Sequence, residues 1–183
     1  MSPAQITYRP ATPFDAPRIA ELHTRSWRET YRGDMSDDYL DHTAPKERLD
    51  VWTQRFSEEN EALRVFLAED GKLLVGFCCL LMEHSRQDGT LLDNLHVHSE
   101  YRKHGIGKRL MHWAAKQVMN YDPAGKLYLW VLETNTPAID VYRHLGGSTG
   151  RSEQHQLPGS GPAGVSAIAV HFDPDELRRR TAV

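Results

Sequence analysis

The sequence predicts an α/β protein in the broad sense, which is α+β in the narrower one. We expect a mixed, mostly antiparallel central sheet with helices on both faces. Three apolar strand patterns, over residues 63–68, 73–82 and 91–98, follow one another with only short polar connections between them. Short connections join antiparallel neighbours, whereas helical crossovers between strands allow parallel pairing. The spacing of apolar residues becomes helical after the glycine-containing turn at residues 105–107 and again after residue 135. These two predicted helices can serve as crossovers between strands.

Length and composition indicate one globular unit. A chain of 183 residues, 39% apolar and 26% charged, is long enough to bury a core of its own. It contains no repeat, low-complexity tract or linker, so we expect a single domain over residues 1–183. The formal net charge of −3 argues against general binding to nucleic acid or anionic membranes, because both require a basic surface. No leader pattern follows Met1 and no apolar run reaches eighteen residues, so we expect a cytoplasmic protein.

Two helices are predicted before the first long strand. The first covers residues 15–31, and its buried stripe consists of Ile19, Leu22, Ser26 and Trp27. The second covers residues 45–56, and its stripe consists of Leu49, Trp52 and Phe56.

The three strands that follow form a meander. Asp70-Gly71 predicts a tight hairpin turn between the first two, and a polar loop over residues 84–89 leads to the third. Cys78 and Cys79 are neighbours within a strand, so their side chains point to opposite faces. A disulfide between them is therefore not expected, and both are interpreted as small core residues rather than catalytic thiols.

The third strand runs into the pattern Arg102-x-x-Gly105-x-Gly107 and then into a helix. Glycines let the backbone approach a ligand, and the first helical turn offers unpaired N–H groups at the positive end of the helix dipole, which suit a phosphate. A dinucleotide fingerprint would need a glycine at position 110, which is Leu, and a P-loop does not match either. The pattern therefore indicates a different cofactor with a diphosphate, although an ordinary strand-to-helix turn would also explain the glycines.

A second informative segment follows about thirty residues later. An unbroken apolar strand over residues 127–132 precedes a helix that Asn135 or Thr136 can cap, with Pro137 in its first turn and Gly146 as a stop. One face of this helix consists of Ala138, Val141, Tyr142 and Leu145, so the Tyr142 side chain is expected to point inward. Two further strands, over residues 151–156 and 165–172, are predicted to pair around a glycine-rich turn at residues 159–161.

Together these two segments resemble the core of the GCN5-related N-acetyltransferase (GNAT) superfamily. Its acyl-CoA loop, Arg/Gln-x-x-Gly-x-Gly/Ala, is matched by Arg102, Gly105 and Gly107, and its second motif by Asn135, Ala138, Tyr142 and Gly146. The opening at residues 8–15 is also typical of the family, and residues 26–33 are similar to a subset of bacterial members. The resemblance implies the acyl-CoA N-acyltransferase fold, acetyl-CoA as co-substrate, no metal, and an amine acceptor.

The resemblance also implies roles for particular residues. Backbone groups of Leu95, His96 and Val97 would hold the pantetheine and the thioester. The pyrophosphate would be bound by Arg102, Lys103, His104, Gly105, Ile106, Gly107 and Lys108. Asn135 would contact the cofactor, and Tyr142 would be the general acid that protonates the departing thiolate, unless it is merely packed beside the cofactor.

The general base is less clearly indicated. Some family members carry a glutamate where this chain has Leu91, and Asp93 lies two residues further on the same strand. Asp93 is therefore the first candidate, acting directly or through water, and Glu83 is the second. A relay of water without a single base is a third possibility.

Three further features leave alternatives open. Trp27 and Tyr31, one helical turn apart, would either line the acceptor pocket or belong to the core. His96-x-His98 could suggest a metal hydrolase, but no third ligand stands at a recognisable spacing. The predicted activity is acetyl transfer from acetyl-CoA to a primary amine of a small molecule or a peptide, by direct attack in a ternary complex, and the alternative is a catalytically inert acyl-CoA sensor. A homodimer is a further possibility.

Overall fold

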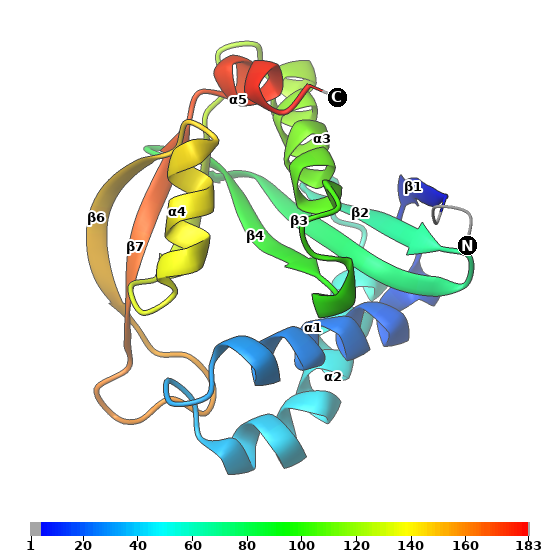
Figure 1. Ribbon diagram of the computed structural model, residues 1–183, viewed down its shortest axis with the longest axis vertical. Coiled ribbons are helices and arrows are strands. Elements are labelled where there is room, and N and C mark those ends of the chain that lie inside the picture. Colours follow the sequence, from blue (N-terminus) through cyan, green and yellow to red (C-terminus); the bar gives the residue numbers. More distant parts are fainter. Residues whose placement is uncertain (1–4, 183) are drawn as a thin grey trace.

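The computed structural model describes residues 5–182, and its centre is one seven-stranded sheet in the order β1-β2-β3-β4-β5-β7-β6 (Figure 1). The strands are β1 Ile6–Pro10, β2 Leu63–Asp70, β3 Leu73–Ser85, β4 Gly89–Val97, β5 Leu127–Leu132, β6 Ser148–His155 and β7 Val165–Phe172. Every neighbouring pair is antiparallel except β4 with β5. The mixed, mostly antiparallel sheet is thus confirmed.

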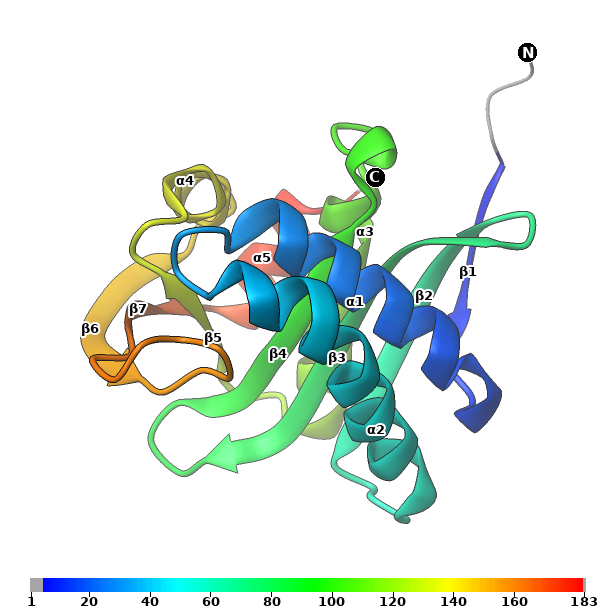
Figure 2. The same ribbon diagram turned by 90° about the horizontal axis from the view of Figure 1, so that it is seen from below.

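Helices cover both faces of this sheet. The α-helices are α1 Ala16–Thr30, α2 Ala44–Ser57, α3 Ile106–Tyr121, α4 Thr136–His144 and α5 Pro174–Arg180. Helices α3, α4 and α5 lie on one face, and α1 and α2 cover the other (Figures 1 and 2). Cys78 packs in the cluster on the α3 side and Cys79 in the cluster on the α1 side, which confirms their opposite directions. Burial raises the pKa of both thiols, so both stay protonated.

Several local details differ from the sequence prediction. The two hairpin residues between β2 and β3 are Gly71 and Lys72, with Gly71 at φ +58°, rather than Asp70-Gly71. Leu49 is 39% exposed, because Trp52 and Phe56, four residues apart, fill the buried face of α2 by themselves. A single π-helical turn, Tyr39–Thr43, leads into α2 and was not predicted.

Two differences concern the C-terminal half. On α4, Ala138, Tyr142 and Leu145 pack on the core as predicted, but Val141 is 55% exposed and Ile139 is buried in its stead. Helix α5 was not predicted, although Asp173 caps it by accepting a hydrogen bond from the Glu176 N–H at 2.9 Å. The Asp-Pro pair at its start is a usual signal for a helix N-terminus.

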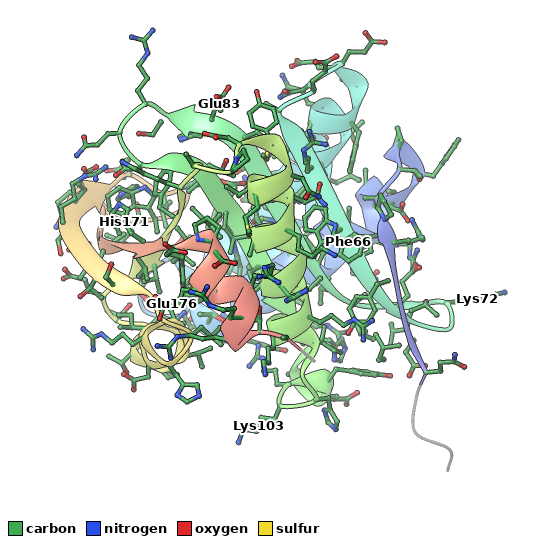
Figure 3. All side chains as sticks on the ribbon, turned by 90° about the horizontal axis from the view of Figure 1, so that it is seen from above. Phe66, Lys72, Glu83, Lys103, His171 and Glu176 are labelled. Carbon is green, nitrogen blue, oxygen red and sulfur yellow. The ribbon has the colours of Figure 1, made fainter. Side chains whose placement is uncertain are left out.

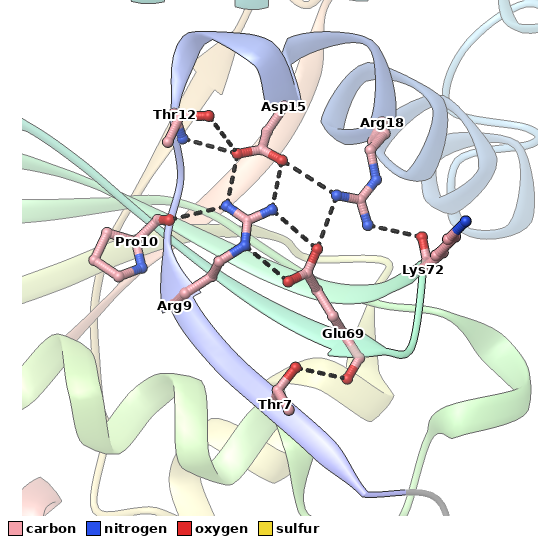
Figure 4. Close-up of polar contacts among 8 residues, drawn as sticks. All are labelled: Thr7, Arg9, Pro10, Thr12, Asp15, Arg18, Glu69 and Lys72. Atoms are coloured by element: carbon pink, nitrogen blue, oxygen red, sulfur yellow. Dashed lines mark hydrogen bonds and ion pairs between the residues drawn. The ribbon is translucent and has the colours of Figure 1, made fainter.

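An ion-pair network fastens the N-terminal segment to the sheet (Figure 4). The Arg9 guanidinium on β1 donates two hydrogen bonds to Asp15, at 2.8 and 2.7 Å, and another to Glu69 on β2 at 2.8 Å. Arg18 on α1 lies 3.2 Å from Asp15 and 2.8 Å from Glu69. Since Asp15 is buried, its pairing with Arg9 holds the pKa of its carboxyl well below the usual range.

We expect Asp15→Asn to lower the free energy of unfolding at pH 7 by about 1.5–3 kcal/mol, the usual loss for hydrogen bonds to a charged group. The stabilisation by Asp15 is present above the ordinary carboxyl pKa and is lost as the pH falls through the depressed folded pKa, so the difference between the two proteins shrinks in acid. Urea denaturation at several pH values measures it. Asp50→Asn is the matched control, because Asp50 pairs with Lys46 on the open surface, and an equal loss in both variants would contradict the prediction.

In the described part of the chain, no helix combines the length and the apolar character that a membrane span requires. Residues 1–4, where the sequence was searched for the start of a leader pattern, lie outside the described residues.

Candidate functional site

The parallel strands β4 and β5 separate soon after they meet. They pair only through Thr90 with Leu127 and Leu91 with Tyr128. On its other side β4 bulges, because Leu80 pairs with Leu92 and Cys79 with Asn94, which leaves Asp93 as an extra residue. A bulge bends its strand, so β4 turns away from β5 beyond this point and opens a wedge in the sheet.

A first cavity of about 370 Å³ lies in this wedge. Its walls are residues 92–97 of β4 and 129–131 of β5, and it extends from Gly107 at the start of α3 to Asn135 and Tyr142 at α4. Ser26, Thr30 and Tyr31 at the end of α1 also line it, so five segments that are separate in the sequence meet around one space, as Figure 1 shows for α3, β4 and α4.

Alternation along β4 decides which backbone groups face the cavity. The His98 N–H donates to the Val75 carbonyl on β3 at 2.9 Å. In an antiparallel pair every second residue bonds to the partner strand, so His96 is also engaged with β3, opposite Phe77. The peptide groups of Leu95 and Val97 point the other way, toward the wedge. Two of the three predicted pantetheine contacts thus have backbone groups on the wedge side, although the Val97 carbonyl already accepts from Arg102 Nε at 3.4 Å, whereas His96 offers its ring instead.

The glycine turn has the geometry of an anion site. Gly105 at φ +80° precedes α3, and the first bond of this helix runs from the Arg109 N–H to the Gly105 carbonyl at 3.0 Å. The N–H groups of Ile106, Gly107 and Lys108 therefore have no partner within the helix. Because the Ile106 side chain is buried in the core, Ile106 offers only its backbone.

The predicted basic cluster divides into engaged and free side chains. Arg102 pairs with Glu29 of α1 at 2.8 Å, and the His104 ring contacts the Arg102 carbonyl at 2.9 Å. Lys103, at φ +66°, and Lys108 are exposed and form no ion pair within residues 5–182. These two ammonium groups are the ones available to an anion.

Asn135 and Tyr142 stand on the opposite wall. Asn135 caps α4, since its side-chain oxygen accepts from the Ala138 N–H at 3.4 Å. The Tyr142 ring packs edge-on against Phe172, with 6.2 Å between centroids. Within residues 5–182 its hydroxyl has no hydrogen-bond partner, so a purely structural role for this group is not supported. Burial, and then the nearby Tyr31, raise the pKa of Tyr142, so it stays protonated at neutral pH.

A second cavity, of about 430 Å³, lies on the α1 and α2 side of the sheet. Its walls include Trp27, Arg48, Arg55 and His155. The two cavities share the lining residues Tyr31, Leu92, Asp93, Asn94, His96 and Trp130. They therefore adjoin at the bulge of β4. Trp27 is 9% exposed and packs in the core cluster around Leu40, and it also lines this cavity.

The two candidate bases have very different positions. Asp93 Oδ2 lies 2.8 Å from Arg55 Nη1 and also accepts from the Asn94 side chain, while Oδ1 has no partner in the described chain. Glu83 accepts a hydrogen bond from Tyr121 at the last residue of α3, at 2.9 Å. Figure 3 shows Glu83 and Lys103 near opposite ends of this helix. Glu83 lines neither cavity, so the structure does not bring this second candidate base to the wedge.

The two histidines of the H-x-H pattern have separate partners. The His96 ring lies 4.7 Å from that of His23, and burial, followed by the charge of Arg102, lowers the pKa of His96 to about 4. The His98 ring contacts the Arg25 guanidinium. Among the described residues, no group of three or more His, Cys, Asp or Glu side chains is placed to hold a metal ion.

Sequence reasoning did not select His23, Arg48 or Arg55, although all three line the second cavity. Arg48 and Arg55 are seven residues apart and so share one side of α2, but charged side chains at that spacing are equally typical of a solvated face. No signal in the sequence separates the two cases.

Comparison with known proteins gives a consistent result. A model of the acetyltransferase (GNAT) family matches residues 16–146. The chain is 28% identical over 157 residues to a probable N-acetyltransferase of Mycobacterium tuberculosis, Rv2775, which covers 81% of this chain and 86% of that protein. It is 31% identical over 141 residues to the uncharacterized N-acetyltransferase YuaI of Bacillus subtilis, and this alignment covers 75% of this chain and 78% of that protein.

Among solved structures, the fold is similar to that of the PaiA N-acetyltransferase of Thermoplasma acidophilum in complex with coenzyme A. The TM-score is 0.68 at 20% identity, covering 92% of this chain and 99% of that one. The segment matched by the family model contains β4, the glycine turn, β5 and α4, which together form the first cavity.

Proposed function

The chain belongs to the acetyltransferase (GNAT) family, and we propose that it transfers an acetyl group from acetyl-CoA to a primary amine of a small molecule or a peptide. The observation that carries this proposal is the wedge between β4 and β5, which connects an anion-binding turn to a tyrosine hydroxyl and adjoins a second cavity. Two ligands could meet there without a covalent enzyme intermediate, which supports direct attack in a ternary complex.

The first cavity has groups that suit two parts of acetyl-CoA, its diphosphate and its pantetheine arm. The free N–H groups at the start of α3, with Lys103 and Lys108 beside them, suit the diphosphate. Peptide groups of Leu95 and Val97 suit the amide-containing pantetheine arm, by extending the hydrogen bonding of β4. A similar fold binds coenzyme A in the Thermoplasma protein. Acetyl-CoA supplies the activated acyl group.

Tyr142 is proposed as the general acid. Its hydroxyl lines the first cavity, has no partner in residues 5–182 and stays protonated, so it can donate a proton to the sulfur as the thiolate leaves. The free Oδ1 of Asp93 lies where the two cavities adjoin, and we propose that it accepts the proton of the amine, directly or through water. Asn135 and Tyr31 complete the proposed walls around the reacting groups.

We expect Asp93→Asn to lower kcat by about 100-fold, the usual contribution of a positioned base. A carboxylate can accept a proton and the carboxamide that replaces it cannot, so the variant lacks the proposed base at every pH. Steady-state rates from pH 5 to 9 measure it, with urea denaturation to show that loss of the Arg55 pair has not unfolded the protein. A variant rate equal to that of the unmodified protein at every pH would assign the proton to water.

The proposed function is tested by two linked measurements. Calorimetric titration with acetyl-CoA should show saturable binding to one site, and incubation with a panel of primary amines should release free thiol and yield the acetylated amine by mass spectrometry. Binding without transfer to any amine would indicate an acyl-CoA sensor. Absence of binding would overturn the proposal.

A further inference from the structure

The second cavity contains an unusual group of unpaired polar atoms. Within residues 5–182, four buried side-chain nitrogen or oxygen atoms have no hydrogen-bond partner. Three of them, His23 Nε2, Arg48 Nε and His155 Nε2, belong to residues that line this cavity. Buried polar groups are nearly always paired, so this concentration marks a place where a ligand supplies the missing partners.

The tautomer of His23 follows from its neighbours. The Trp52 indole N–H, which can only donate, donates to His23 Nδ1 at 3.0 Å. Burial lowers the pKa of His23 well below its ordinary value, and the charges of Arg48 and Arg55 lower it further, so the ring is neutral. Its single proton is then on Nε2. This atom is therefore a hydrogen-bond donor without an acceptor.

Arg48 is a second donor at the same place. Its guanidinium lies over the Trp27 ring, 4.6 Å from the centroid, and its side chain is only 11% exposed. One terminal nitrogen contacts Glu47, whose carboxylate also accepts from the Tyr39 hydroxyl at 3.0 Å. The Nε and the other terminal nitrogen of Arg48 have no acceptor within the described residues.

The charges of the cavity lining do not balance. Its two guanidinium groups are Arg48 and Arg55, and its single carboxylate, Asp93, is paired with Arg55 at 2.8 Å. Glu47, the partner of Arg48, is not part of the lining. Glu47 meets the charge of Arg48, but Arg48 Nε still has no acceptor among the described residues. A carboxylate of the ligand is the acceptor that forms the strongest hydrogen bonds with a guanidinium group.

We propose that the acceptor is a primary amine that also carries a carboxylate, held by Arg48 with help from His23. This inference rests on the proposed function and names the class of its acceptor. Arg48 and Arg55 are seven residues apart on α2, about 10 Å along the helix axis, so the carboxylate end and the amine end, beside Asp93, are separated by several bonds. A free amino acid with a distant amine and a peptide with an acidic side chain both provide this chemistry.

Matched acceptors test the proposal. The first series is glycine, γ-aminobutyrate and ε-aminocaproate, each compared with its carboxamide, and the second is a set of short peptides that contain Glu or Gln near a free N-terminus. We expect kcat/KM to be higher for the carboxylate than for its amide by about tenfold or more in the longer acceptors and the peptides, since a charge-assisted hydrogen bond is lost in each amide, whereas glycine is too short to show this preference. If the ratio of kcat/KM between acid and amide is larger in the first series, the carboxylate comes from a free amino acid; if it is larger in the second, it comes from the side chain of a peptide.

Two variants locate the effect. Arg48→Met keeps an apolar stem over Trp27 and should reduce the ratio of kcat/KM for the acid to kcat/KM for its amide to about one. Arg64→Met should leave this ratio unchanged. Arg64 is the matched control, because its Nε is the fourth buried atom without a partner and it lies on β2, outside this cavity. Calorimetric dissociation constants for each acid and amide, in the presence of CoA, give a second readout that does not depend on turnover.

The outcomes separate the inference from the function. Transfer to acids and amides with equal kcat/KM would overturn the inference and leave the proposed function intact. A preference for carboxylates over carboxamides that persists in Arg48→Met would do the same. Carboxylate-selective binding that Arg48→Met abolishes, without transfer to any amine, would support the inference and overturn the proposed function.

Discussion

Replacement of Tyr142 by Phe is expected to lower kcat by about 100-fold or more, while the dissociation constant of acetyl-CoA changes by no more than about threefold. The thiolate of CoA is a poor leaving group without a proton, and the Tyr142 hydroxyl is the proposed donor at the wall of the first cavity. Loss of the hydroxyl leaves the ring and its packing against Phe172 in place, so binding should persist. Single-turnover rates and calorimetry measure the two quantities separately.

Stability distinguishes this role from a structural one. The Tyr142 hydroxyl forms no hydrogen bond within residues 5–182, so Tyr142→Phe should change the free energy of unfolding by less than about 0.5 kcal/mol. Tyr8→Phe is the control, because Tyr8 lies on β1 and lines neither cavity. An unchanged turnover number, or a loss explained by weaker acetyl-CoA binding, would reject Tyr142 as the acid.

Gly107→Glu is expected to weaken acetyl-CoA binding by about 100-fold or more, because a carboxylate beside the diphosphate costs several kcal/mol. A Cβ at Gly107 would meet only the Val97 side chain, at 3.8 Å, so the backbone can accept the substitution. Gly105 is a poorer test, since its φ of +80° strains any other residue. An acidic residue in the first turn of α3 also interacts favourably with the helix dipole, so binding should be lost without loss of stability.

The control for this variant is Gly161→Glu. Gly161 lies between β6 and β7 with open space around its Cβ position. The Gly161→Glu substitution therefore introduces the same charge away from the glycine turn. Calorimetry with acetyl-CoA and with free CoA measures both variants. If Gly107→Glu binds acetyl-CoA as tightly as Gly161→Glu does, the diphosphate is not held at the start of α3.

Much of the fold follows from signals that act within a few residues. The strands from residue 63 onward, the helix at residues 16–30 and the cap at Asn135 were all predicted from period and capping. The errors have local causes too. Leu49 fits the apolar period of α2 but stands at the edge of its buried face, and Val141 is outside the core because Ile139 takes the inner position on α4.

The candidate site was predictable only in part. The glycine turn and Tyr142 carry their own patterns, and the structure brings both to one cavity. The sequence favoured Asp93 over Glu83 as a candidate base, but it did not predict the bulge of β4 or the ion pair between Asp93 and Arg55 on α2.

The sequence by itself determined the order of most helices and strands, the glycine turn before α3 and the family, because each of these depends on residues that are close in the chain. The tertiary structure decided what the second cavity contains. His23, Arg48 and Asp93 come from three elements separated by 25 residues or more, and only their packing buries them together. Burial removes most water as a hydrogen-bond partner, so side chains that would be ordinary on a surface become unpaired polar groups in the wall of a cavity.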